Sequence, residues 1–198
     1  MDCVAKGSSL LPRRWILPLL LLAGGLGAWQ SPYLSDAAAP PDERLTDTWQ
    51  LLKAESSPID PWNTLTVEIN AGPSRLTLLR RWHGPTDYTA VDSIHVPIDG
   101  SAHRAPLSEW PDNRHIGATV DPDRPRRVAS EWLDDGRTLR VTSRFWVQVS
   151  QGTRRIRTDT EYRVAPDGDR LIVLERRSTR PRARRYVFER VSGARPGR

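Results

Sequence analysis

The chain has 198 residues and a formal net charge of +6, with 37% apolar and 27% charged residues. These proportions fit one globular domain with additional segments. They exclude a disulfide-stabilised scaffold, because Cys3 is the only cysteine, and no Cys/His pattern typical of a structural zinc site occurs.

Charge is divided unevenly along the sequence. From Arg124 to the C-terminus there are 20 arginines and 9 acidic residues, whereas residues 36–123 carry an acidic excess. Two interpretations stay open. The two halves attract each other within one fold, or the basic half forms a surface for an anionic partner.

An apolar run occupies residues 15–29 and follows the basic residues Lys6, Arg13 and Arg14. As a helix this run measures about 22 Å, and its extension to Leu34 reaches the length needed to cross a bilayer. Residues 1–34 are therefore predicted to be either a retained signal anchor, in the membrane over residues 15–34, or a cleaved signal peptide. A retained anchor places the protein in the inner membrane with its domain on the periplasmic side. A cleaved signal peptide predicts that the protein is secreted.

A linker rich in proline and alanine is predicted over residues 35–44, followed by a β-domain over residues 45–192 and a disordered tail over 193–198. The β-domain shows alternating apolar and polar residues between turn signals, without a sustained helical period. The expected strands cover residues 47–52, 64–70, 75–82, 88–98, 127–133, 138–149, 155–164, 170–178 and 184–191. Short turns between them predict an all-β antiparallel meander that closes into a barrel or folds into a sandwich.

The segment from Ser101 to Arg124 differs from the rest because its prolines interrupt regular structure. We expect a long loop here, with a single strand near residues 115–120. Long loops within compact domains are commonly functional.

The opening stretch Asp47-Thr48-Trp49-Gln50-Leu51-Leu52, the repeated Asp-Gly turns and the closing "RRYVFERV" resemble small exported bacterial lipocalin-like proteins. The resemblance covers roughly residues 45–191 and departs at Asp47, where glycine is usual. It implies a lipocalin-like fold and a tendency to bind ligands, without indicating which ligand. It also implies that Trp49 closes the barrel floor, with Arg185 or Arg190 packed over it.

The leading hypothesis is therefore a non-catalytic barrel that holds a small apolar or amphipathic ligand by burial of apolar surface. Alternation predicts which residues line the interior, with the opposite faces of the same strands as the alternative if the register is reversed. The predicted lining residues are Trp49, Leu139, Val141, Phe145, Val147, Ile156, Tyr162 and Val173.

The alternative is an envelope interaction module that docks on anionic lipid or protein through an arginine-rich hairpin at Arg180, Arg182, Arg184 and Arg185. We expect no nucleic-acid partner outside the cytoplasm. The sequence has no nucleophile motif, phosphate-binding loop or metal-binding histidine spacing, so no catalytic residue, cofactor or metal is predicted. A weaker third hypothesis is a hydrolase that uses His103 or His115.

Overall fold

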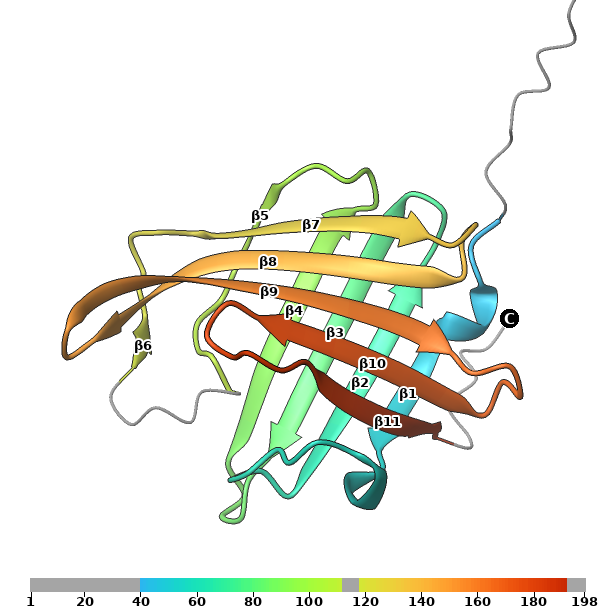
Figure 1. Ribbon diagram of the computed structural model, residues 1–198, viewed down its shortest axis with the longest axis horizontal. Coiled ribbons are helices and arrows are strands. Elements are labelled where there is room, and N and C mark those ends of the chain that lie inside the picture. The colour runs from blue at the N-terminus through green and yellow to red at the C-terminus, as the bar shows by residue number, and fades with distance from the viewer. Residues whose placement is uncertain (1–39, 112–117, 192–198) are drawn as a thin grey trace, which may run out of the picture. The chain divides into compact units, whose positions relative to one another are not determined.

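The computed structural model describes residues 40–111 and 118–191, which form an antiparallel β-structure with two short 3₁₀ helices (Figure 1). The predicted N-terminal helix, most of the linker and the tail lie outside these residues. The elements are η1 (Glu43–Leu45), β1 (Asp47–Leu51), η2 (Lys53–Glu55), β2 (Thr64–Ala71), β3 (Arg75–His83), β4 (Thr89–Pro97), β5 (His103–Ala105), β6 (Thr119–Val120), β7 (Arg126–Leu133), β8 (Thr138–Val149), β9 (Gly152–Val164), β10 (Arg170–Arg177) and β11 (Arg184–Arg190).

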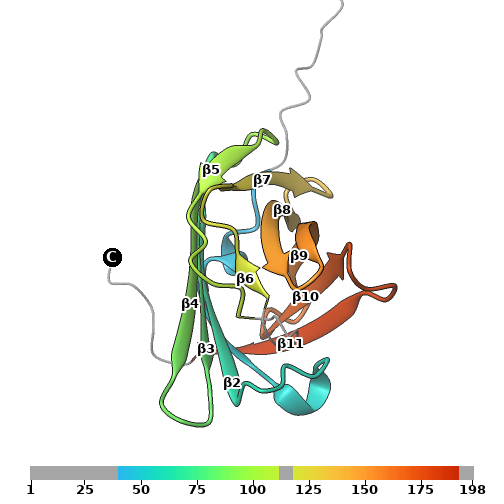
Figure 2. The same cartoon turned by 90° about the vertical axis from the view of Figure 1, so that its left-hand side faces the viewer.

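The strands form one continuous sheet in the order β4-β3-β2-β1-β11-β10-β9-β8-β7-β5, and the short β6 pairs with β8. β1 pairs with both β2 and β11, so the last strand returns to the first. Figure 2 shows that β2–β4 form one wall and that β7–β11 curve round to face it. The predicted all-β antiparallel meander is confirmed, and it forms a nearly closed barrel.

Three Asp-Gly pairs make turns, as the sequence predicted. Gly100, Gly136 and Gly168 all have positive φ angles, of 73°, 81° and 85°. Only glycine adopts this region without steric cost, which explains its position after aspartate at each turn.

The 101–124 segment contains more structure than expected. β5 pairs with β7, and its last residue, Ala105, lies opposite Arg126. The prediction of an irregular loop is wrong here, because three residues between the Asp-Gly turn and Pro106 suffice to add a strand before proline ends it. The expected strand near residues 115–120 falls partly outside the described residues, and β6 occupies its last two positions.

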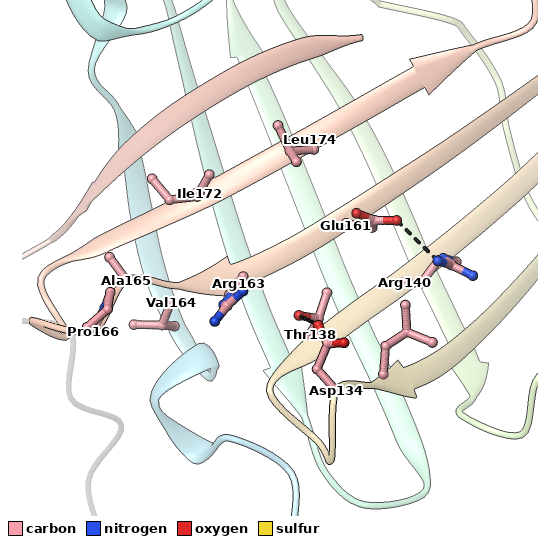
Figure 3. Close-up of a pocket in the computed structure, with 11 residues that line it drawn as sticks. Asp134, Thr138, Arg140, Glu161, Arg163, Val164, Ala165, Pro166, Ile172 and Leu174 are labelled. Carbon is pink, nitrogen blue, oxygen red and sulfur yellow. Dashed lines mark hydrogen bonds and ion pairs between the residues drawn. The ribbon is translucent and has the colours of Figure 1, made fainter.

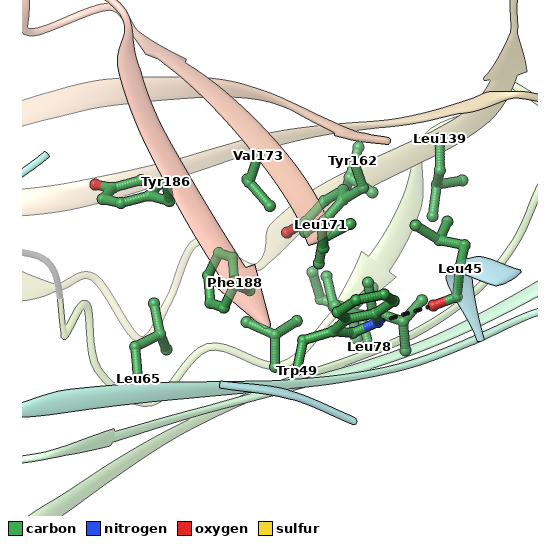
Figure 4. Close-up of a cluster of buried hydrophobic side chains, with 14 of the residues drawn as sticks. Leu45, Trp49, Leu65, Leu78, Leu139, Tyr162, Leu171, Val173, Tyr186 and Phe188 are labelled. Carbon is green, nitrogen blue, oxygen red and sulfur yellow. Dashed lines mark hydrogen bonds between the residues drawn. The ribbon is translucent and has the colours of Figure 1, made fainter. Parts of the chain in front are cut away.

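Inward-facing apolar side chains from most of the strands form the main core of the barrel, part of which is drawn in Figure 4. Trp49 is fully buried there and donates its indole N–H to the carbonyl of Leu45 at 3.2 Å. The Arg190 guanidinium lies 4.4 Å from the centre of a Trp49 ring and also pairs with Asp47. Arg190 therefore packs over Trp49, which is one of the two contacts that the resemblance implied. Arg185 is exposed instead. Its backbone N–H donates to the hydroxyl of Ser57, and its guanidinium donates to the carbonyl of Glu55.

No β-ladder joins β4 to β7, so side chains close this seam. Arg126 on β7 pairs with Asp92 on β4 at 2.8 Å and donates to the carbonyl of Ser93 at 2.9 Å. Farther along, the Ser130 hydroxyl donates to the carbonyl of Pro97 at 2.7 Å. The side chains of Arg126 and Asp92 are only 1% and 2% exposed, so this ion pair is isolated from solvent.

Replacing Arg126 with methionine is expected to destabilise the fold by about 3–5 kcal/mol, because it leaves the Asp92 carboxylate buried with a partner missing. Arg127→Met is a matched control, since Arg127 is the next residue of β7 and is exposed. Its effect should stay within about 0.5 kcal/mol. Urea unfolding measures both values, and equal stability of the two variants would show that the seam does not depend on Arg126.

Candidate functional site

The structure places all eight predicted ligand-lining residues inside the barrel, but in two groups. Trp49, Leu139, Val141, Tyr162 and Val173 belong to the main core. Phe145, Val147 and Ile156 form a second cluster on the long β8–β9 hairpin, with Leu107 and Trp110 packed against it.

These side chains largely fill the interior. Two voids remain between them, each of about 30 Å³. A water molecule takes up about 30 Å³ in the liquid, and sites for drug-sized ligands span roughly 300–1,000 Å³. In this conformation the two voids do not accommodate a lipid-sized ligand.

The interior also holds a group of charged side chains that the sequence analysis did not identify. Asp92 on β4 bonds both to Arg80 on β3 and to Arg126 on β7. Glu175 on β10 accepts a hydrogen bond of 2.6 Å from Arg177 two residues later. The carboxylate of Glu175 also interacts with the charge of Arg80, which links the two pairs.

Arg184 on β11 extends this group toward the C-terminal strand. It is buried and donates a hydrogen bond of 3.1 Å to the hydroxyl of Tyr186. We define the interior polar cluster as Arg80, Asp92, Arg126, Glu175, Arg177 and Arg184. Four guanidinium groups there face two carboxylates, so the cluster carries a formal charge of +2.

Strand alternation places these charged residues inside. Arg80 follows Leu78 and precedes Trp82 on the inward face of β3, and Glu175 and Arg177 continue the inward series of Leu171 and Val173 on β10. The interior polar cluster could therefore have been predicted from charged residues that occupy inward positions of amphipathic strands. It was not predicted because strand alternation was used only to select apolar residues.

Burial shifts the pKa values within the cluster. It raises the pKa of Glu175 above its usual value, against the attraction of Arg80 and Arg184. It also lowers the pKa of Arg177 to about 9, with further lowering from the positive charges of Arg184, Arg180 and Arg80. Both shifts have the same physical cause, since a low-dielectric interior disfavours the charged form of any group.

The two voids lie on either side of a shared wall formed by Arg80, Trp82 and Glu175. One void is mainly apolar, and its other lining residues are Ile59, Leu65, Val67, Thr160, Tyr162, Val173, Tyr186 and Phe188. The other void is the cationic one, and its remaining lining residues are Asp92, Leu107, Trp110, Pro111, Arg126, Ser143, Phe145, Thr158 and Arg177. An apolar chamber and a cationic chamber thus adjoin within the barrel.

Four buried polar atoms of the cationic chamber's lining residues lack a hydrogen-bond partner. Three of them can donate, namely the Nε atoms of Arg80 and Arg126 and the Oγ atom of Ser143. The fourth is Oδ1 of Asp92, which lies 2.8 Å from the Arg126 guanidinium in an ion pair. A buried donor without a partner costs about 1–3 kcal/mol. These donors would be satisfied by a water molecule or by the oxygens of an acidic group.

Residues 106–111 cover the cationic chamber, which Leu107, Trp110 and Pro111 help to line. Trp110 packs edge-on against Phe145, and the guanidinium of Arg177 lies 5.4 Å from the centre of a Trp110 ring. The carbonyl of Pro111 accepts a hydrogen bond from the indole of Trp62. The segment therefore forms the outer wall of the cationic chamber.

The four arginines predicted to form an anion-binding hairpin do not share one surface. Arg182 and Arg185 are exposed and Arg180 is half-buried, whereas Arg184 points into the barrel. The structure thus assigns Arg184 to the interior polar cluster.

A larger hollow of about 460 Å³ lies on the outer face of β8–β10 (Figure 3). Ile172 and Leu174 line it on one side, and Arg140 and Glu161 form an ion pair of 3.2 Å within it. Its lining combines aliphatic side chains with an internally neutralised pair. The interior chambers, with their unpartnered donors, are the stronger candidate site.

The histidine considered for a hydrolase contacts a carboxylate, but at the surface. His103 lies 3.0 Å from Asp99, and their side chains are 34% and 45% exposed. His95, on the other side of the Asp99-Gly100 turn, forms a hydrogen bond with Thr77 on β3. His115 lies outside the described residues.

No known protein family matches this chain, and no curated protein is detectably similar to it. Within residues 40–111 and 118–191, no helix is long and apolar enough to span a membrane. The candidate site therefore rests on the geometry of the barrel.

Glu175 is expected to make folding stability depend on pH. Because its pKa is raised in the folded protein, the folded state binds more protons than the unfolded chain between the usual and the raised value. This contribution to stability therefore decreases as the pH rises through that window. Urea unfolding at a series of pH values should show a flatter profile for Glu175→Gln than for the wild type. Glu189→Gln, on the neighbouring strand β11, is the control, and a wild-type profile in Glu175→Gln would contradict the assignment.

Proposed function

We propose that this chain is a non-catalytic binding protein, exported or tethered to the membrane, whose barrel takes up a small amphipathic ligand with an acidic head group. The observation that carries this proposal is the cationic chamber beside the apolar chamber. Its unpartnered arginine donors and the +2 formal charge of the interior polar cluster suit a carboxylate, sulfate or phosphate group.

The wall between the chambers suggests how such a ligand would lie. Arg80, Trp82 and Glu175 separate the chambers, so a ligand that displaced these side chains would join them. Its head would meet Arg80, Arg126 and Arg177, and its apolar part would extend toward Val173 and Phe188.

Ligand entry requires the interior to expand from its small voids. Residues 106–111 are the natural point of opening, because Leu107 and Trp110 are only partly buried where they pack against the second cluster. Outward movement of Trp110 would free Phe145 and the Arg177 guanidinium together.

The chemistry of the cluster favours binding over catalysis. Guanidinium groups bind oxyanions through several donors and exchange protons poorly near neutral pH. They would hold an acidic head group without acting on it.

Arg80→Gln is expected to weaken binding of the anionic dye anilinonaphthalene sulfonate about tenfold, the effect of losing one charge-assisted hydrogen bond of about 1.5 kcal/mol. This variant keeps the ion pair between Asp92 on β4 and Arg126 on β7, which is the contact that crosses the seam. Fluorescence titration measures the affinity, and the neutral dye Nile red should bind both proteins equally.

Arg81→Gln is the matched control, because Arg81 follows Arg80 on β3 but pairs with Glu68 on the outside. It should bind the anionic dye like the wild type. Equal affinity of Arg80→Gln and Arg81→Gln, or no binding of the anionic dye to the wild type, would overturn the proposed function.

Binding of the anionic dye should weaken as the pH rises through about 9, the pKa to which burial lowers Arg177. Above that value Arg177 loses its charge, while the sulfonate keeps its own. Titrations on both sides of this pH should therefore differ for the wild type and agree for Arg177→Gln. A wild-type affinity that is constant across this range would show that Arg177 does not take part.

A further inference from the structure

The outer face of β5, β7, β8 and β9 carries four arginines in direct cross-strand register. Arg104 lies opposite Arg127, Arg127 opposite Arg144, and Arg144 opposite Arg157. Directly paired residues project from the same face, and adjacent strands are about 4.8 Å apart, so the row spans about 14 Å. We call these four residues the arginine row.

The arginine row is unfavourable for folding, because like charges directly opposite each other destabilise a sheet. Among the described residues, Arg157 is the member with an ion pair, at 2.8 Å from Asp159. The charge of Arg144 also acts on Asp159, and against the opposing effect of burial it lowers the pKa of that carboxyl together with the Arg157 guanidinium. Within the described part of the chain, no ion pair is found for Arg104 or Arg127. Arg104 and Arg127 are exposed, and Arg144 is half-buried.

A parallel row on the same strands shows the usual arrangement. Arg140 on β8 lies between Glu131 on β7 and Glu161 on β9, and it pairs with both, at 3.5 and 3.2 Å. The same sheet therefore neutralises its charges within one row, whereas the four guanidinium groups of the arginine row share a single neighbouring carboxylate, that of Asp159. Stability alone does not account for the arginine row.

The cationic surface continues past Arg144 to Trp146 on the same face of β8. Arg155 lies directly opposite Trp146, and the guanidinium of Arg124 lies 4.6 Å from the centre of a Trp146 ring. A half-buried tryptophan flanked by arginines is suited to the interface between lipid head groups and water.

We propose that the arginine row docks on an anionic lipid surface. The charges lie across the broad face of a sheet, where they can meet many head groups at once. This inference uses the outer face and does not depend on a ligand inside the barrel.

The point where the chain enters the barrel favours a membrane over a soluble polyanion. The N–H of Asp42 donates to the carbonyl of Gly136 at 2.9 Å, so the chain arrives beside the β7–β8 turn. These are the two strands that carry Arg127 and Arg144. If the predicted anchor is retained, residues 35–41 reach at most about 25 Å from its end to Asp42 and hold the domain near the bilayer.

The full chain is tested in lipid nanodiscs of phosphatidylcholine alone and of phosphatidylcholine with phosphatidylglycerol. A fluorophore on Gln148→Cys, in a Cys3→Ser background, reports docking through quenching by labelled head groups. We expect strong quenching in the anionic discs, weak quenching in the neutral discs, and loss of the difference at high salt.

The triple variant Arg104→Gln/Arg127→Gln/Arg144→Gln should lower the ratio of docked to undocked molecules about 100-fold, since each basic residue near an anionic surface contributes about fivefold. The control Arg75→Gln/Arg81→Gln/Arg163→Gln removes three outer-face charges elsewhere and should dock like the wild type. Because the arginine row is self-repulsive, the first triple variant should unfold no more easily than the control.

Equal quenching in the two kinds of disc, or docking unchanged by the first triple variant, would overturn the proposal. So would a first triple variant markedly less stable than the control, which would assign the arginine row to the fold. Binding of soluble polyphosphate by the wild type, with equal quenching in both discs, would identify a soluble polyanion as the partner and would also overturn it.

Discussion

The barrel depends on one buried carboxylate, that of Asp92. It meets Arg80 from β3 and Arg126 from β7, so it joins two walls that share no hydrogen-bond ladder at the seam. Two guanidinium groups on one carboxylate leave an uncompensated charge and Nε donors without partners. The interaction that closes the barrel therefore also creates the cationic chamber.

Apolar side chains of similar size would close such a seam at least as well, because buried ion pairs often stabilise a fold less than good packing does. The barrel already shows the apolar solution at its other end, where Trp49 is fully buried beneath Arg190. One end is thus filled and fixed, while the other keeps charges, small voids and a covering segment. This asymmetry is what a binding site needs, since affinity for an anion comes from donors that the protein leaves unsatisfied.

The strands and their turns could be predicted because alternation and Asp-Gly pairs act locally. β5 could not, since its three residues gain a strand only from pairing with β7. All eight residues predicted to face the interior are buried, because alternation fixes which face of a strand packs inward. Whether they line a cavity or fill it depends on side-chain packing between strands distant in sequence. The role of Asp92 could not be predicted for the same reason, because its ion pairs form only when β3, β4 and β7 meet in the folded barrel.

The uneven charge of the sequence is explained in two different ways by the structure. Acidic residues of the first half pair with arginines of the second where the barrel closes, as Asp92 does with Arg126 and Asp47 with Arg190. This is attraction within one fold. The arginine row lies on strands β5, β7, β8 and β9, away from the acidic strands, and its cross-strand neighbours are themselves arginines. The parallel row is neutralised by two carboxylates, those of Glu131 and Glu161, whereas the arginine row has Asp159 alone beside Arg144 and Arg157. The repulsion that remains among the four arginines is a cost that an external anion would offset.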